Sequence, residues 1–131
     1  FARLPGVKAF IDKVRTTAKY RGYIFDICGR VLNYDVESHW KASNGIIQGG
    51  CADIMKLAMV KIHPLFKDKK SKLFLQVHDE LCVYIHKDEL YLAAQIVKEL
   101  EGAYKPKILP LTSGAAHSKI AWNELVDGIP C

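Results

Sequence analysis

A chain of 131 residues that is 50% hydrophobic and 25% charged has the composition of one compact globular unit, which argues against a disordered tail. No apolar run approaches the roughly 20 residues needed to span a bilayer, and no secretory leader is visible, so we expect no membrane partner. The formal net charge of +5 suits a polyanionic partner such as nucleic acid without requiring one.

The cysteines and histidines do not form a metal-binding pattern. The four cysteines stand at positions 28, 51, 82 and 131 without a C-x-x-C pair, and the five histidines show no clustered spacing. A structural zinc site needs clustered Cys or His ligands. Cys51 and Cys82 fall in apolar segments, where a free thiol behaves as a small hydrophobe. We therefore expect a reduced, intracellular setting.

The first periodic segment follows almost directly on Phe1, and a start without Met indicates a fragment of a longer protein. Apolar residues recur there at a spacing of three and four, which predicts a helix over Pro5–Lys19 with proline near its first turn and Gly22 at its end. The opposite face is basic, which solvation explains as well as DNA contact does: Lys8, Lys13, Arg15 and Lys19.

Two short runs of strand-forming residues come next. They are Tyr23–Phe25 and Val31–Asn33, on either side of Cys28-Gly29. Strand formers that flank a glycine turn predict a short β-hairpin.

A long helix is predicted from about Ser38 to His63, with Pro64 after it. Asn44 and Gln48, four residues apart, share a face that differs from the apolar one. Gly49-Gly50 in the interior costs roughly 1 kcal/mol per glycine relative to alanine. Such a cost indicates close approach by another backbone, a bend or a ligand. The predicted apolar stripe consists of Ile47, Cys51, Ile54, Ala58 and Ile62.

The segment Lys72–Ile85 reads as a second hairpin with an acidic tip. Leu73, Leu75 and Val77 alternate with Phe74, Gln76 and His78, and a similar alternation follows Glu80, which is the period of strands with one buried face. Acidic residues are poor strand formers, so a pair of them at a tight bend calls for an explanation. A carboxylate on a rigid hairpin is a suitable ligand for a divalent metal such as Mg²⁺.

The remaining segment predicts one more helix, beginning at Asp88 as N-cap and closed by Gly102. Ile108-Leu109 and Leu111 predict a final strand, and the prolines beside it place that strand at an edge. No repeat, low-complexity tract or domain boundary is visible.

Three segments together resemble the family A DNA polymerases, the bacterial DNA polymerase I class. Asn44–Lys56 follows the helix pattern N-x-x-x-Q-G-x-x-A-D-x-x-K of that family, and Leu75–Leu81 resembles its catalytic palm hairpin. Phe1–Val7 resembles the Y-F-x-x-Y-P-G-V entry to a fingers-side helix. Gly29-Arg30 falls where the family has a G-R-R hairpin, and Trp122 where a tryptophan lies near its C-terminus.

The resemblance implies an α+β fold with an antiparallel palm-type sheet and packed helices. Residues 1–131 would then form the C-terminal part of a polymerase catalytic domain, the end of the fingers plus the palm. The implied reaction is template-directed addition of a deoxynucleoside triphosphate to a primer, with two Mg²⁺ ions assisting in-line transfer. The implied setting is DNA replication in the bacterial cytoplasm (nucleoid), or in a host cytoplasm if the source is viral.

Site residues follow from the same resemblance. Asp79 would be a catalytic, metal-binding aspartate, with Glu80 as an assisting carboxylate or else a solvated turn residue. His78 would lie beside the primer terminus, unless it is a structural histidine at a strand end. Asn44 and Gln48 would reach the minor groove of primer–template DNA, where base-pair acceptors occupy similar places in every sequence. Exposed amides on an ordinary helix are the competing interpretation.

The chain also departs from the family pattern. Val31 replaces the second arginine of G-R-R, and Asp26-Ile27-Cys28 before the glycine is unusual. Trp40-Lys41 occupies a stretch where the family often has an arginine. Arg30 and Lys41 are the candidate DNA-binding cations that remain, although lysine lacks the fork geometry of arginine.

The second metal-binding aspartate and the triphosphate-binding Lys and Tyr of the family lie upstream of these motifs. One aspartate cannot hold two divalent ions, because the clamp needs oxygens from separate strands. We therefore expect the chain alone to be inactive and to need the missing N-terminal part of the polymerase as a partner. The alternatives are a non-catalytic duplex DNA-binding module and a structural fragment with exposed apolar surface.

Overall fold

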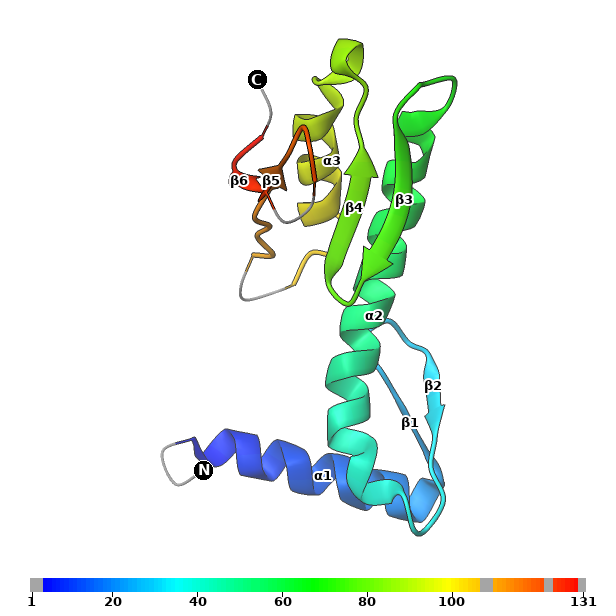
Figure 1. The fold of residues 1–131 in the computed structure, drawn as a ribbon. Helices are drawn as coiled ribbons and strands as arrows, with labels where there is room; N and C mark the ends of the chain where they lie inside the picture. Colours follow the sequence, from blue (N-terminus) through cyan, green and yellow to red (C-terminus); the bar gives the residue numbers. More distant parts are fainter. Residues whose placement is uncertain (1–3, 107–109, 122–123, 130–131) are drawn as a thin grey trace. The chain divides into compact units, whose positions relative to one another are not determined.

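The computed structural model describes residues 4–106, 110–121 and 124–129 (Figure 1). Within it the chain forms two compact units, residues 1–53 and residues 54–131, whose boundary falls inside helix α2, Ala42–Ile62. The expectation of a single compact unit without an internal boundary is therefore wrong. The physical reason is that the two ends of α2 belong to separate hydrophobic clusters, each with its own hairpin.

The first unit contains helix α1 (Pro5–Arg21), strands β1 (Tyr23–Phe25) and β2 (Val31–Asn33), the 3-10 turn η1 (His39–Lys41) and the start of α2. The predicted first helix and first hairpin are confirmed. Gly22 ends α1 in the left-handed conformation, with φ of 76°, and its N–H donates to the carbonyl of Ala18. The core of this unit consists of Val14, Ala18, Ile24 and Ala42, with Leu32, Tyr34 and Ile46 packed against it.

The second unit contains the rest of α2, the 3-10 turn η2 (His63–Phe66), the hairpin β3 (Lys72–Val77) and β4 (Glu80–Tyr84), the turn η3 (Lys87–Glu89) and helix α3 (Leu92–Glu101). A short pair, β5 (Ala116–His117) and β6 (Val126–Asp127), follows. One face of the β3–β4 hairpin packs on α2 and α3. The cluster consists of Ile62, Leu92 and Ile96, with Leu65, Phe66, Leu73, Leu81, Val83 and Ile85 around it.

All three sheets of the described chain are two-stranded and antiparallel, and with the helices they confirm the α+β class. No helix among the described residues is both long and apolar enough to cross a bilayer.

The β3–β4 hairpin departs from simple alternation. Its register shifts between Leu73 and Leu75, so Leu73 pairs with Val83 but Leu75 pairs with Cys82. Val83 and Cys82 are neighbours in β4 and point to opposite faces, so Leu73 and Leu75 do too. Predicting one buried face for Leu73, Leu75 and Val77 was wrong because a bulge at Phe74 was not visible in the pattern. Phe74 is 63% exposed.

Three further boundaries differ from the sequence expectations. Asp88 lies in η3, and the α-helix begins only at Leu92, because the side chain of His86 accepts the Asp88 N–H and closes a separate turn. Ser38 is the N-cap of η1 and His63 is the first residue of η2, so both lie outside α2. Leu111 lies outside any strand, and Ile108-Leu109 lie outside the described residues.

Candidate active-site hairpin and nucleic-acid face

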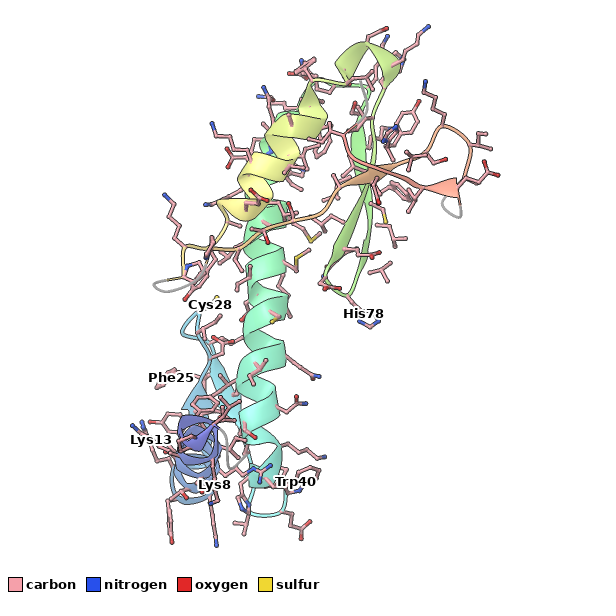
Figure 2. All side chains as sticks on the ribbon, turned by 90° about the vertical axis from the view of Figure 1, so that its left-hand side faces the viewer. Lys8, Lys13, Phe25, Cys28, Trp40 and His78 are labelled. Atoms are coloured by element: carbon pink, nitrogen blue, oxygen red, sulfur yellow. The ribbon has the colours of Figure 1, made fainter. Side chains whose placement is uncertain are left out.

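The tip of the β3–β4 hairpin is a turn of two residues, His78 and Asp79, closed by the pairing of Val77 with Glu80. His78 adopts φ of 51°, a left-handed conformation that tight hairpin turns require. The side-chain amide of Gln76 donates to the carbonyl of His78 at 3.0 Å, which fixes the turn. Figure 2 shows His78 at the end of this hairpin.

The side chains at this tip face solvent. His78, Asp79 and Glu80 are all exposed, so both carboxylates are available to a ligand. Carboxylate oxygens are the ligands that Mg²⁺ prefers, and one or two of them, with water and substrate phosphates, are enough to hold it. Among the described residues, no group of three or more His, Cys, Asp or Glu side chains is placed to hold a metal. The donor chemistry therefore fits Mg²⁺ as part of a site, with further ligands required.

A second set of predicted residues lies in the other unit. Lys41, Asn44 and Gln48 are all exposed, on η1 and the first turns of α2. The stripe predicted for this helix is only partly confirmed. Ala58 and Ile62 are buried, but Ile47 is 58% exposed and Cys51 is exposed, because the packed face of this half of α2 is the glycine face described below.

Arg30, the remaining predicted DNA-binding cation, is held by two carboxylates. Its Nε lies 2.8 Å from Oδ2 of Asp53 on α2 and 3.1 Å from Oδ2 of Asp26 at the end of β1. The side chain of Arg30 keeps 45% of its surface exposed. We call the set Asp26, Arg30 and Asp53 the Arg30 clamp. It joins the β1–β2 hairpin to α2 within the first unit.

Asp26 is the buried member of the clamp. Burial is the largest influence on its carboxyl group and acts to raise the pKa. Hydrogen bonds outweigh it and lower the pKa of Asp26 below its ordinary value, beginning with the backbone N–H of Arg30 at 2.9 Å. The backbone N–H of Cys28, at 2.9 Å, contributes as well. Asp26 therefore stays ionised at neutral pH and organises the hairpin turn.

The glycines of α2 face the same hairpin. A Cβ atom on Gly49 would lie 2.9 Å from Nη2 of Arg30, and one on Gly50 would lie 2.7 Å from Cγ1 of Ile27. A Cβ on Gly45 would meet the hydroxyl of Tyr34. Close packing by side chains of the β1–β2 hairpin thus accounts for Gly49 and Gly50, where the sequence suggested another backbone, a bend or a ligand.

The structure brings the predicted residues together as two groups. Lys41, Asn44 and Gln48 lie in the first unit, which also contains the Arg30 clamp, and the tip His78-Asp79-Glu80 lies in the second. Trp122 and the first three residues of the fingers-side motif lie outside the described residues.

Sequence reasoning missed the roles of Asp26 and Asp53. Asp26 stands four residues before Arg30 across a glycine turn, which is a local signal for an ion pair. Asp53 is distant in sequence from both, so only the fold reveals its role.

Comparison with known proteins finds relatives over most of the chain. The profile of DNA polymerase family A matches residues 1–118. The chain is 37% identical over 122 residues to the thermostable DNA polymerase I of Thermus aquaticus, covering 85% of this chain and 14% of that protein. It is 31% identical over 124 residues to DNA polymerase I of Chloroflexus aurantiacus, covering 86% of this chain and 13% of that protein.

A solved structure gives the same result. The fold resembles the POL domain of Pol1 from M. smegmatis, in complex with DNA primer-template and dNTP, with a TM-score of 0.72 and 31% identity. That match covers 80% of this chain and 21% of the other. The chain thus spans a small part of its relatives, and over that part it belongs to DNA polymerase family A.

Proposed function

We propose that the chain is the C-terminal part of a polymerase catalytic domain, the end of the fingers plus the palm, and that it takes part in template-directed DNA synthesis. The match to the family over residues 1–118 supports this proposal. So does the likeness to a POL domain whose structure contains primer-template and dNTP. Primer–template DNA and deoxynucleoside triphosphates would be its substrates, and the cytoplasm that contains the DNA would be its setting.

The observation that carries the proposal is the two-residue turn that holds Asp79 in solvent at the tip of a paired hairpin. Asp79 would hold a catalytic Mg²⁺ ion, and Glu80, the first residue of β4, would assist. When bound, Mg²⁺ supplies charge stabilisation on the triphosphate and activates the primer hydroxyl. The turn itself contributes a carboxylate whose position is fixed by the β3–β4 ladder and by Gln76.

The remaining exposed residues would hold DNA. Asn44 and Gln48 carry amides that can hydrogen-bond to minor-groove acceptors in any base pair. Lys41 would contact backbone phosphate, and His78 would lie beside the primer end. Arg30 has further N–H donors beyond the Nε used in its clamp, so it can bind a phosphate while remaining paired.

The chain alone would be inactive. Asp79 and Glu80 are adjacent in sequence, and two metal ions need carboxylates that converge from separate strands. A second aspartate would come from the rest of the polymerase, which is the remaining partner in this proposal.

The experiment compares wild-type and Asp79→Ala forms of the polymerase that contains this chain. Asp79→Ala should abolish nucleotide addition and leave the Kd for primer–template DNA nearly unchanged, because Asp79 acts on the metal and not on the duplex. Asp127→Ala, at an exposed position in β6, is the matched control and should behave as wild type. Normal turnover by Asp79→Ala would favour the alternative, a non-catalytic duplex-binding module.

A further inference from the structure

A tryptophan precedes α2 in an unusually open position. Trp40 lies in η1 and is 55% exposed, although tryptophan has more apolar surface to bury than any other residue. Figure 2 shows it beside the first turns of α2, on the side away from the labelled hairpin residues Phe25 and Cys28. The α2–hairpin packing therefore does not use this ring.

The turn that carries Trp40 is held without it. The N–H of Ser38 donates to Oδ1 of Asp35 at 2.6 Å, and the N–H of Asp35 donates to Oγ of Ser38 at 3.2 Å. The N–H of His39 donates to the carbonyl of Asp35 at 3.1 Å. These bonds fix the backbone that carries the indole ring and do not use the ring itself.

The residues that follow Trp40 suit a polyanion. Nζ of Lys41 lies 5.3 Å from the centre of the ring, and the exposed Asn44, Ile47 and Gln48 follow on α2. The sequence has no acidic residue from Lys41 to Ala52. The first one after that, Asp53, pairs with Arg30 in the clamp. The strip from Trp40 to Gln48 thus combines an aromatic ring, a cation and two amides. The nearest carboxylates in the sequence, Asp35 and Glu37, lie in the turn before it, and Asp35 accepts the Ser38 N–H there.

We propose that Trp40 stacks on an unpaired nucleotide where single-stranded template adjoins the duplex that Asn44 and Gln48 contact. Within a duplex, each base already stacks on its neighbours, so an aromatic side chain finds an open face only on an unpaired or terminal base. Lys41 beside the ring attracts a backbone phosphate of the adjoining duplex. This inference rests on the proposed function, since the DNA is the primer–template of the polymerase.

The test measures two dissociation constants for the polymerase that contains this chain, at one fixed salt concentration. One DNA has a single-stranded template overhang, and the other is a blunt duplex with the same paired sequence. Trp40→Ala should weaken binding to the overhang DNA by roughly fivefold or more and leave binding to the blunt duplex unchanged. Trp40→Phe, which keeps an aromatic face, should retain most of the preference for the overhang.

Tyr20→Ala is the matched control, because Tyr20 is an aromatic residue of the same unit that is 80% exposed. It should bind both DNAs as wild type does. Equal weakening on both DNAs, no change in Trp40→Ala, a Trp40→Phe variant as weak as Trp40→Ala, or the same loss in Tyr20→Ala would each overturn the inference. Nucleotide addition by Asp79→Ala, measured in parallel, tests the proposed function separately, so the two failures are distinguishable.

Discussion

Nε of Arg30 lies 2.8 Å from Oδ2 of Asp53, and this ion pair fastens the β1–β2 hairpin to the helix that carries Asn44 and Gln48. Since Asp26 binds the same nitrogen from the hairpin side, one guanidinium is shared by two elements. A residue predicted only as a DNA ligand is therefore also a structural connector of the first unit.

The clamp predicts an order of effects on stability. Asp26→Asn should lower the midpoint of thermal unfolding most, because Asp26 is buried and also accepts two backbone N–H groups. Asp53→Asn should have a smaller effect, since it removes one of the two carboxylate charges that pair with Arg30. Asp12→Asn breaks an exposed pair with Lys8 and should change the midpoint least. An equal effect of all three variants, measured by circular dichroism, would contradict the role of the clamp.

Gly49 and Arg30 should be coupled. A Cβ at position 49 meets the end of the Arg30 side chain and displaces it from its carboxylates, so Gly49→Ala should destabilise the chain. In an Arg30→Ala background that obstacle is absent. There Gly49→Ala should stabilise the chain by up to about 1 kcal/mol through helix propensity. Urea unfolding of the four proteins in the cycle measures the coupling, and strictly additive effects would rule it out.

The hydrogen bonds of Glu89 predict that the folded chain loses stability in acid. The Ser71 hydroxyl is the largest influence that lowers the pKa of Glu89, and the N–H groups of Lys70 and Ser71 act in the same direction. A carboxyl group whose pKa is lower in the folded state contributes stability above its unfolded pKa, and this is lost as the pH falls through the folded value. Between about pH 5 and pH 3, wild type should therefore lose more stability than Glu89→Gln.

The control for that measurement is Glu124→Gln, at an exposed carboxylate in the same unit. It should follow the wild-type pH dependence. Parallel curves for wild type and Glu89→Gln would show that the bonds to Ser71 carry no proton linkage.

Lys41 should act on DNA through charge. Lys41→Gln, in the polymerase that contains this chain, should weaken binding to overhang and blunt DNA alike. It should also reduce the slope of log K against log salt concentration by about one, since one phosphate contact is lost. Lys87→Gln makes the same change in net charge at an exposed position in η3 of the other unit. If both variants change the slope equally, the salt dependence reflects net charge, and a specific contact between Lys41 and phosphate is ruled out.

Local patterns predicted much of this fold. The periodic apolar residues of α1, the glycine turn before β2 and the acidic tip at Asp79 are all encoded within a few neighbouring residues. The family motifs added the α+β class and the order of the elements. Two of the failures were tertiary in origin, the bulge at Phe74 and the division of the chain inside α2. The late start of α3 at Leu92 was local, because the His86–Asp88 turn precedes it.

At the candidate site, too, the sequence predicted local features and missed contacts between distant residues. Asp79, Asn44 and Gln48 are exposed, and their contact with ligands stays a prediction. The partners of Arg30 and the hairpin that packs on Gly49 could not be predicted, because Asp53 and Arg30 are 23 positions apart and meet only in the folded unit.

Metal ligation by Asp79 is tested most directly by exchanging its oxygen for sulfur. In the polymerase that contains this chain, Asp79→Cys should lose nucleotide addition with Mg²⁺, which binds oxygen, and regain part of it with Mn²⁺, which accepts softer ligands more readily. Asp79→Ala should be inactive with both ions. Activity of Asp79→Ala comparable to wild type, or equal recovery of both variants with Mn²⁺, would contradict a metal-binding role for this carboxylate.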